Sequence, residues 1–198
     1  MAYKVVIPQD ITAPGKDYLL ERGYEVVIGS GSTKAEDIQK EIADADALLV
    51  RTAPYTAEIL SAAKKLKVIG RHGIGVDNID LGYCKDNNIV VTFAPTSNSI
   101  TVAEHTMGLM IAAAHNIVRT DAGMRKGLWE IRNQFNGYDL EGKTVGLVGM
   151  GRIGAMVTKM AYEGMGMKVI GYDPYLPVER YPKGAEKVET VEEIFEKA

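Results

Sequence analysis

Three glycines with a characteristic spacing follow a short apolar run in the last third of the chain. The run "TVGLV", Thr144–Val148, is typical of a buried strand, and Gly149, Gly151 and Gly154 after it fit the pattern G-x-G-x-x-G. In this pattern the first glycine permits a tight turn, the second lets the backbone approach a pyrophosphate, and the third lets the next helix pack closely. The spacing therefore predicts a dinucleotide-binding loop.

The residues after the glycines supply further groups that a dinucleotide needs. Arg152 and Ile153 lie at the predicted start of a helix, where backbone N–H groups bind phosphate oxygens. The strand "KVIGY" then leads to Asp173, 24 residues after Gly149 (173 − 149). A carboxylate at this position accepts hydrogen bonds from ribose hydroxyls and repels a 2′-phosphate, which favours NAD over NADP. The alternative is a glycine-rich turn followed by an ordinary loop aspartate.

Two earlier loops could bind a carboxylate. The segments "RTAPYT" and "RHGIGVDNID" each follow a predicted strand, and ligands of doubly wound sheets bind at the carboxyl ends of strands. Glycines in the second loop would let the N–H groups of Ile74 and Gly75 approach an anion, and Arg51 would supply a cation. A tight turn followed by a helix capped by Asp77 or Asn78 explains the second loop equally well.

Elements with alternating character must position these loops. The predicted strands of the first half are Lys4–Ile7, Glu25–Ile28, Ala47–Arg51, Lys67–Ile69 and Ile89–Phe93. Between them lie helical patterns: "PGKDYLLERG" ending at Gly23, "STKAEDIQKEIADA" with a Ser-Thr cap region, and "TAEILSAAKK" with Thr56 as N-cap and lysines in its last turn. This alternation predicts an α/β fold, a parallel sheet with helices on both faces.

A single long helix is predicted from Ile100 to Met124. Its centre is apolar nearly all round, so we expect it to be buried between layers or between subunits, and we expect a homodimer formed through it.

Composition limits the possible partners and compartments. The net charge of −3 argues against non-specific nucleic-acid binding, and the longest apolar run, Leu109–Ala114, is too short to cross a bilayer. One cysteine, Cys84, and an N-terminal segment without the apolar core of a secretory signal favour a reducing compartment. We therefore expect a cytoplasmic protein with neither a nucleic-acid nor a membrane partner.

The loops together resemble a known family. The stretches "LLVRTAPYT", "GRHGIGVDNIDL", "NSITVAEHTMGLM", "GMRKGLWE", "LEGKTVGLVGMGRIG" and "VIGYDPY" occur in the order typical of the D-2-hydroxyacid dehydrogenases, and the chain is most similar to the phosphoglycerate-dehydrogenase-like branch. The resemblance implies a flavodoxin-like substrate domain over 1–98. Connecting helices and the first half of a Rossmann-type NAD-binding domain would follow over 99–198, with an active site in the cleft between the domains.

The resemblance also implies residue roles. It places the substrate, a 2-hydroxy or 2-keto acid, at Arg51, Ile74, Gly75 and Asn98. It places NAD at Ile74, Gly149, Gly151, Arg152, Ile153, Gly154 and Asp173, with the nicotinamide near Ile74.

The sequence departs from the family in its catalytic groups. An Arg, a Glu and a His from later strands and loops of the NAD domain carry out catalysis in the family, and no position here matches them. His72, His105 and His115 are the only histidines, and we assign none of them, nor any metal site, a role in catalysis. We expect a dehydrogenase by family whose 198 residues are inactive alone. The alternative is a non-catalytic, NAD-responsive binding module like the related corepressors.

Overall fold

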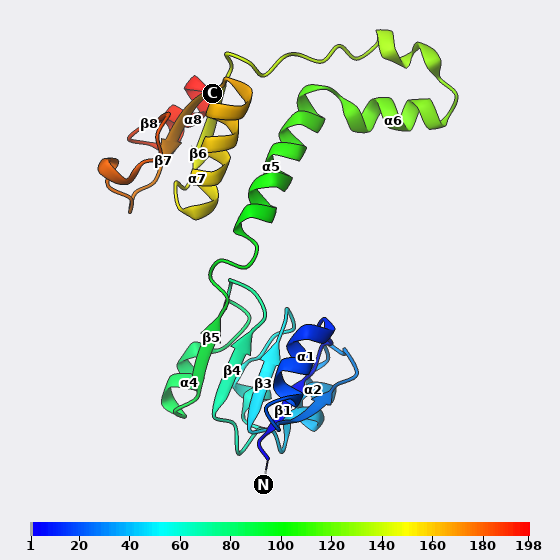
Figure 1. Ribbon diagram of the computed structural model, residues 1–198, viewed down its shortest axis with the longest axis vertical. Coiled ribbons are helices and arrows are strands. Elements are labelled where there is room, and N and C mark those ends of the chain that lie inside the picture. The colour runs from blue at the N-terminus through cyan, green and yellow to red at the C-terminus, as the bar shows by residue number, and fades with distance from the viewer. Residues whose placement is uncertain (1) are drawn as a thin grey trace. The chain divides into compact units, whose positions relative to one another are not determined.

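A computed structural model of the protein describes residues 2–198. The chain divides into two compact units, Met1–Ser97 and Asn98–Ala198, each an uninterrupted stretch of sequence (Figure 1). The sequence had suggested a boundary one residue later, between 98 and 99. Each unit is built on a parallel sheet of its own.

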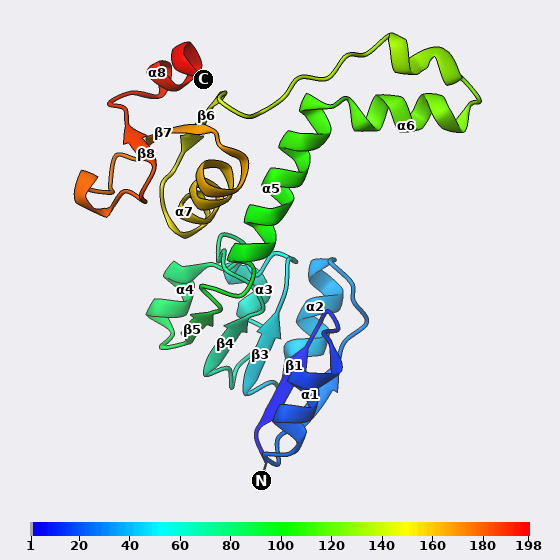
Figure 2. The same ribbon diagram turned by 45° about the horizontal axis from the view of Figure 1, so that its top comes forward.

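The sheet of the first unit has five parallel strands. They are β1 (Lys4–Ile7), β2 (Glu25–Ile28), β3 (Ala47–Val50), β4 (Val68–Arg71) and β5 (Val90–Phe93). Their spatial order is β2-β1-β3-β4-β5, the flavodoxin-like arrangement, which confirms the predicted fold class (Figure 2). Four strand ends differ from prediction: β3 ends one residue before Arg51, β4 spans Val68–Arg71 in place of Lys67–Ile69, and β5 begins one residue after Ile89. Arg71 remains within the sheet because it is paired in register with Val50.

Short helices connect these strands: α1 (Ala13–Leu20), α2 (Ala35–Ile42), α3 (Ala57–Leu60) and α4 (Leu81–Asp86). Val6, Leu48 and Ile69 are neighbours in register on one face of the sheet and are almost completely buried. Ile38 and Ile42 of α2 belong to the same cluster. The i, i+4 spacing of these isoleucines thus gives α2 its buried face.

Several helix termini differ from the sequence predictions. Helix α1 ends at Leu20, before the predicted terminal glycine Gly23, and the N-cap of α2 is Lys34 and not a residue of the predicted Ser-Thr cap region. Thr56 caps α3 as expected, since its hydroxyl oxygen accepts a hydrogen bond from the Ile59 N–H at 3.4 Å, but α3 ends at Leu60 and the predicted lysines lie outside it. The next helix, α4, is capped by Asp80 and not by Asp77 or Asn78. A bridge between Tyr55 and Ile79 holds the backbone extended there, so the helix begins only after it.

The second unit contains three parallel strands in the order β6-β7-β8. They are β6 (Thr144–Val148), β7 (Lys168–Tyr172) and β8 (Ala185–Lys187). The helices are α5 (Ser99–Ala114), α6 (Ile117–Arg125), α7 (Arg152–Lys159) and α8 (Val191–Lys197), and single turns are formed by Trp129–Asn133, Met160–Gly164 and Val178–Arg180. Helix α5 contributes Ala103 and Met107 to a core that it shares with Val157 of α7 and Val169 of β7.

The predicted single helix from Ile100 to Met124 is wrong. Helix α5 ends at Ala114 and α6 begins at Ile117, because Asn116 between them has φ 53°, in the left-handed region (Figure 1). Asparagine tolerates this conformation, and the Asn116 amide donates a hydrogen bond to the Asn136 carbonyl at 3.2 Å. Within residues 2–198, no helix combines the length and the apolar composition that crossing a membrane requires.

Candidate functional site

The glycine loop joins β6 to α7, and its three glycines differ in their surroundings. Gly149 has φ +98°, which allows the turn, and a Cβ atom added to Gly154 would meet the Gly149 carbonyl oxygen. A Cβ atom added to Gly151 would meet no protein atom within 4 Å. Gly151 is also the N-cap of α7 and offers no side-chain cap, while the first-turn N–H groups of a helix lack partners within it. The loop is therefore open where a phosphate would approach.

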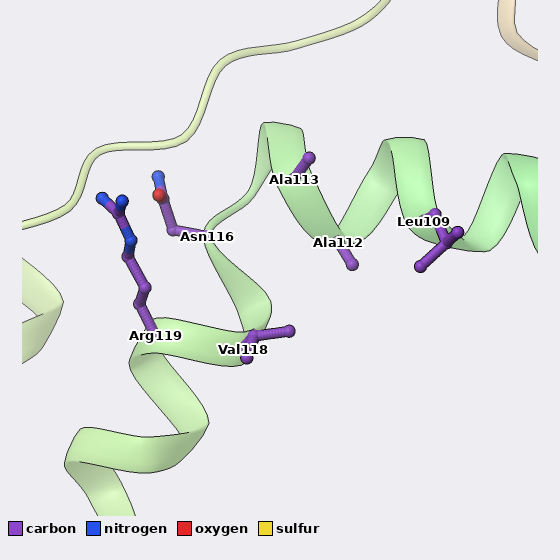
Figure 3. A pocket seen from close by; sticks show the side chains of 6 residues that line it. All are labelled: Leu109, Ala112, Ala113, Asn116, Val118 and Arg119. Atoms are coloured by element: carbon purple, nitrogen blue, oxygen red, sulfur yellow. The ribbon is translucent and has the colours of Figure 1, made fainter.

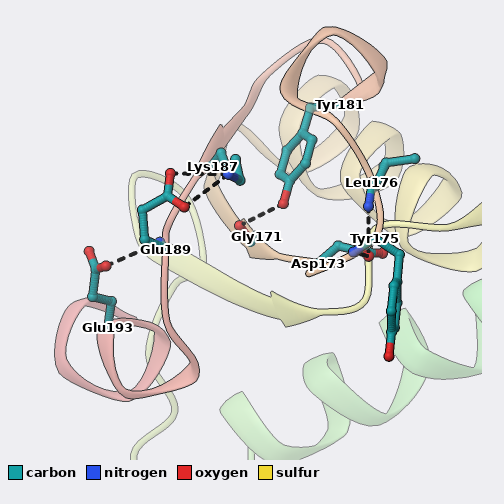
Figure 4. Close-up of polar contacts among 8 residues, drawn as sticks. All are labelled: Gly171, Asp173, Tyr175, Leu176, Tyr181, Lys187, Glu189 and Glu193. Carbon is teal, nitrogen blue, oxygen red and sulfur yellow. Dashed lines mark hydrogen bonds and ion pairs between the residues drawn. The ribbon is translucent and has the colours of Figure 1, made fainter.

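Asp173 lies directly beside this loop. Its Oδ2 accepts a hydrogen bond from the Met150 N–H at 2.9 Å. Its Oδ1 accepts hydrogen bonds from the N–H groups of Tyr175 at 2.9 Å and Leu176 at 3.1 Å (Figure 4). These bonds, that of Met150 first, hold the pKa of the Asp173 carboxyl below its ordinary value, although desolvation acts in the opposite direction. The side chain is therefore ionised at neutral pH.

A hollow of about 440 Å³ adjoins Asp173 at the carboxyl ends of β7 and β8. Its lining includes Tyr175 and Pro177 from the loop after Asp173, and Lys187 and Glu189 from the end of β8. Lys187 and Glu189 form an ion pair at 2.9 Å, as Figure 4 shows. The hollow next to the Asp173 carboxylate is therefore lined by both apolar and charged side chains.

The anion loop of the first unit follows β4. His72 donates its N–H to the Val50 carbonyl at 2.8 Å, and the Gly73 carbonyl accepts a hydrogen bond from the Ala94 N–H at 2.9 Å. Within residues 2–198, the N–H groups of Ile74 and Gly75 have no hydrogen-bond partner. These two donors are consequently available to a ligand.

The positively charged side chain that contacts this loop is Arg71, the last residue of β4. Its guanidinium packs on Gly73 and donates a hydrogen bond to the His72 carbonyl, and its Nε is buried without a partner among the described residues. The predicted cation, Arg51, is exposed and donates a hydrogen bond to the Asp10 carbonyl at 3.1 Å, after β1. Sequence reasoning missed Arg71, although its position at the end of "VIGR" was a usable signal.

Two side-chain amides, which the sequence did not single out for this role, hold the loops of the first unit together. Asn78 donates hydrogen bonds to the carbonyls of Arg51 at 2.9 Å and Ala53 at 2.7 Å. Gln9, after β1, accepts hydrogen bonds from the N–H groups of Thr52 at 3.1 Å and Ala53 at 3.0 Å. The loops after β1, β3 and β4 are therefore linked at the carboxyl edge of the sheet.

Two residues considered from the sequence, Asn98 and His72, lie outside the contacts described above. Asn98 is the N-cap residue of α5 in the second unit, and its side chain forms no capping hydrogen bond. His72 is exposed. Among the described residues no group of three or more His, Cys, Asp or Glu side chains is arranged to hold a metal ion.

Comparison with known proteins relates this chain to one family. The family model for the D-isomer specific 2-hydroxyacid dehydrogenase catalytic domain matches residues 5–173. D-3-phosphoglycerate dehydrogenase of Methanocaldococcus jannaschii is 47% identical over 182 residues, which cover 91% of this chain and 34% of that protein. The chain thus spans about a third of the length of this relative.

Solved structures agree with the sequence comparison. The NAD⁺-bound 3-phosphoglycerate dehydrogenase of Entamoeba histolytica is 34% identical with a TM-score of 0.78, and the match covers 100% of this chain and 61% of that one. The TT0316 protein of Thermus thermophilus is 33% identical with a TM-score of 0.87, over 98% of this chain and 62% of that one.

Replacement of Asn78 tests the connection between the loops. Asn78→Ala removes two hydrogen bonds and leaves the carbonyl of buried Ala53 without this partner, so we expect the free energy of unfolding of the first unit to fall by about 1–3 kcal/mol. Urea denaturation measures this change. Asn87→Ala is the matched control, because the exposed Asn87 amide donates one bond, to the Tyr83 carbonyl at 2.9 Å. Equal effects of the two variants would contradict the role of Asn78.

Proposed function

The chain belongs to the D-isomer specific 2-hydroxyacid dehydrogenase family, and we propose that it carries the substrate-binding domain and part of the NAD-binding domain of such an enzyme. The observation that carries this proposal is the glycine loop, which is open at Gly151 and lies beside the ionised carboxylate of Asp173. The reaction class is oxidation of the CH–OH group of a D-2-hydroxy acid, or the reverse reduction of a 2-keto acid.

We propose NAD as the cofactor. Gly149, Gly151 and Gly154 would form the turn, the N–H groups of Arg152 and Ile153 would bind the pyrophosphate, and Asp173 would accept hydrogen bonds from the adenosine ribose. The ionised Asp173 would repel a 2′-phosphate, which favours NAD over NADP. When bound, NAD supplies or accepts the hydride.

For the substrate we propose the anion loop of the first unit. The available N–H groups of Ile74 and Gly75 would bind the carboxylate, with the nicotinamide near Ile74, and Arg51 and Asn98 would contribute on the substrate side. Arg71 is added to this set, because its guanidinium packs on Gly73. Two arginines in these loops suit an acid with a second anionic group, such as the 3-phosphoglycerate of the named relatives.

We further propose a homodimer formed through α5 and α6. Leu109 and Val118 are exposed apolar residues, 59% and 72% accessible, and Trp129 beyond α6 is 56% accessible. A hollow of about 410 Å³ on this surface is lined by Leu109, Ala112, Ala113, Asn116, Val118 and Arg119 (Figure 3). Exposed apolar surface of this kind typically marks an interface, and a second copy related by a two-fold axis would cover it on both chains.

A cytoplasmic location is proposed from the chemistry of the thiol. Cys84, the single cysteine, is free and buried in the core of the first unit. Burial raises the pKa of its thiol, so it is mostly protonated and unreactive at neutral pH. A protein without a disulfide suits a reducing compartment.

The 198 residues alone are expected to lack dehydrogenase activity, because none of them matches the acid–base histidine and its partners. General acid–base catalysis typically contributes about 10²–10⁴-fold to an enzymatic rate. The measurement is NADH oxidation with glyoxylate, pyruvate or hydroxypyruvate as the acceptor. Turnover on the order of 1 s⁻¹, typical of a working enzyme, would overturn this expectation and make His72 the first candidate for the acid.

Gly151→Ala tests the cofactor site without disturbing the fold. The added methyl group enters space in which no protein atom lies within 4 Å, and Gly151 has an extended backbone with a negative φ of −68°. We expect the affinity for NAD to fall at least about tenfold by calorimetry, since the methyl group occupies the path of the pyrophosphate. Gly164→Ala, also in open space but in a different segment, is the control. NAD affinity that is unchanged in Gly151→Ala would exclude this loop.

Val118→Glu tests the proposed dimer. A carboxylate at this exposed position would be buried without a partner in the interface, so we expect the variant to be monomeric in light-scattering measurements at concentrations where the wild type is dimeric. Val178→Glu introduces the same charge at another exposed valine, which is 55% accessible, and should leave the dimer intact. A monomeric wild type at high concentration would refute the proposal.

A further inference from the structure

The carboxylate of Asp173 is hydrogen-bonded in two directions along the chain. One oxygen accepts a hydrogen bond from the N–H of Met150, 23 residues earlier. The other accepts hydrogen bonds from the N–H groups of Tyr175 and Leu176, two and three residues later (Figure 4). Asp173 therefore contacts the glycine loop through its own side chain.

The acceptor capacity of this carboxylate is largely used within the protein. A carboxylate offers about four lone-pair positions. The structure fills three of them, one on Oδ2 and two on Oδ1. One position is left, on Oδ2, so a ribose hydroxyl would share this oxygen with the Met150 N–H.

Met150 is fixed to the end of β7 by other contacts as well. Its side chain is 2% exposed and its thioether packs against Gly171, where a Cβ atom would not fit. The N–H of Gly149, the preceding residue, donates a hydrogen bond to the Tyr172 carbonyl at 2.7 Å. The Asp173 carboxylate accepts the hydrogen bond of the Met150 N–H through a side chain. A substitution of Asp173 therefore removes this acceptor and leaves the backbone hydrogen bond of Gly149 in place.

We infer that Asp173 is a positioning residue for the pyrophosphate loop: it holds Met150 so that the start of α7 is presented to a diphosphate before any ribose contact is made. This inference rests on the proposed NAD site. The inference assigns Asp173 a role in binding the pyrophosphate of NAD, which its carboxylate would not contact directly.

Charge and positioning predict opposite effects on anion binding. If Asp173 acted near the loop only as a negative charge, Asp173→Asn would strengthen the binding of an anion, because a repulsive charge is lost. If Asp173 positions the loop, the same substitution weakens anion binding, since an amide oxygen is a weaker acceptor for the Met150 N–H than a carboxylate. A probe without a ribose separates these effects from ribose recognition.

The experiment is an NMR titration of the 198-residue chain with inorganic pyrophosphate, followed at the amide signals of Met150, Arg152 and Ile153. We expect Asp173→Asn to weaken pyrophosphate binding about five- to tenfold, the scale of the difference between a charge-assisted and a neutral hydrogen bond. The Met150 amide should exchange with solvent at least about tenfold faster, while the amides of Val169 and Ile170 in β7 stay protected. Glu179→Gln, an equal loss of charge outside these contacts, should not weaken binding.

The pH dependence of the Met150 amide signal gives a second readout, which loss of fold would not produce. The folded pKa of Asp173 is lowered, so the hydrogen bond is fully present above the ordinary carboxyl pKa and is lost as the pH falls through the lowered value. Among the described residues, the other titratable side chains around the carboxylate are Tyr172, Tyr175, Tyr181, Lys187 and Glu189. The pH dependence of the Met150 amide signal should disappear in Asp173→Asn. An effect of the neighbouring groups on this signal would persist in the variant.

The outcomes separate this inference from the proposed function. Pyrophosphate binding that is equal or tighter in Asp173→Asn, with Met150 protection unchanged, overturns the positioning role and leaves the NAD site intact. Failure of the wild-type chain to bind either NAD or pyrophosphate overturns the proposed cofactor site and the inference with it.

Discussion

The backbone groups of loops that leave a parallel sheet must find partners, because the ladder of strand hydrogen bonds ends there. In the first unit the side-chain amides of Gln9 and Asn78 provide these partners for the loop after β3. In the second unit the Asp173 carboxylate does so for the glycine loop. Within residues 2–198, the N–H groups from Ile74 to Asn78 have no such partner, and the two of the anion loop, at Ile74 and Gly75, are among them.

The two units differ in the charge of the groups that hold their loops. Neutral amides hold the loops of the first unit, so the guanidiniums of Arg51 and Arg71 are not offset by the side chains that organise the loops. An ionised carboxylate holds the glycine loop of the second unit and brings a negative charge next to a proposed phosphate site. The loops of the first unit therefore carry positively charged side chains, and the glycine loop of the second unit lies beside a negatively charged one.

Local patterns predicted much of this structure. The five strands, the Thr56 cap and the position of Asp173 beside the glycine spacing depend on neighbouring residues and were predictable. The break at Asn116 was not, because its left-handed conformation is supported by a hydrogen bond to Asn136, 20 residues away. The contacts of Arg71 and Asn78 depend on the register of β3 and β4 and on the loop after each, and a single sequence does not specify these.

The division between Ser97 and Asn98 has a consequence for biosynthesis. Each unit is one continuous segment, and the last strand of the first sheet, β5, ends at Phe93. From Ser97 to the first glycine of the loop, Gly149, the chain adds 52 residues (149 − 97). At about 5–20 residues per second a ribosome needs roughly 3–10 s to add them. The N-terminal sheet, with its anion loop, therefore has time to form on the nascent chain before the glycine loop has left the exit tunnel.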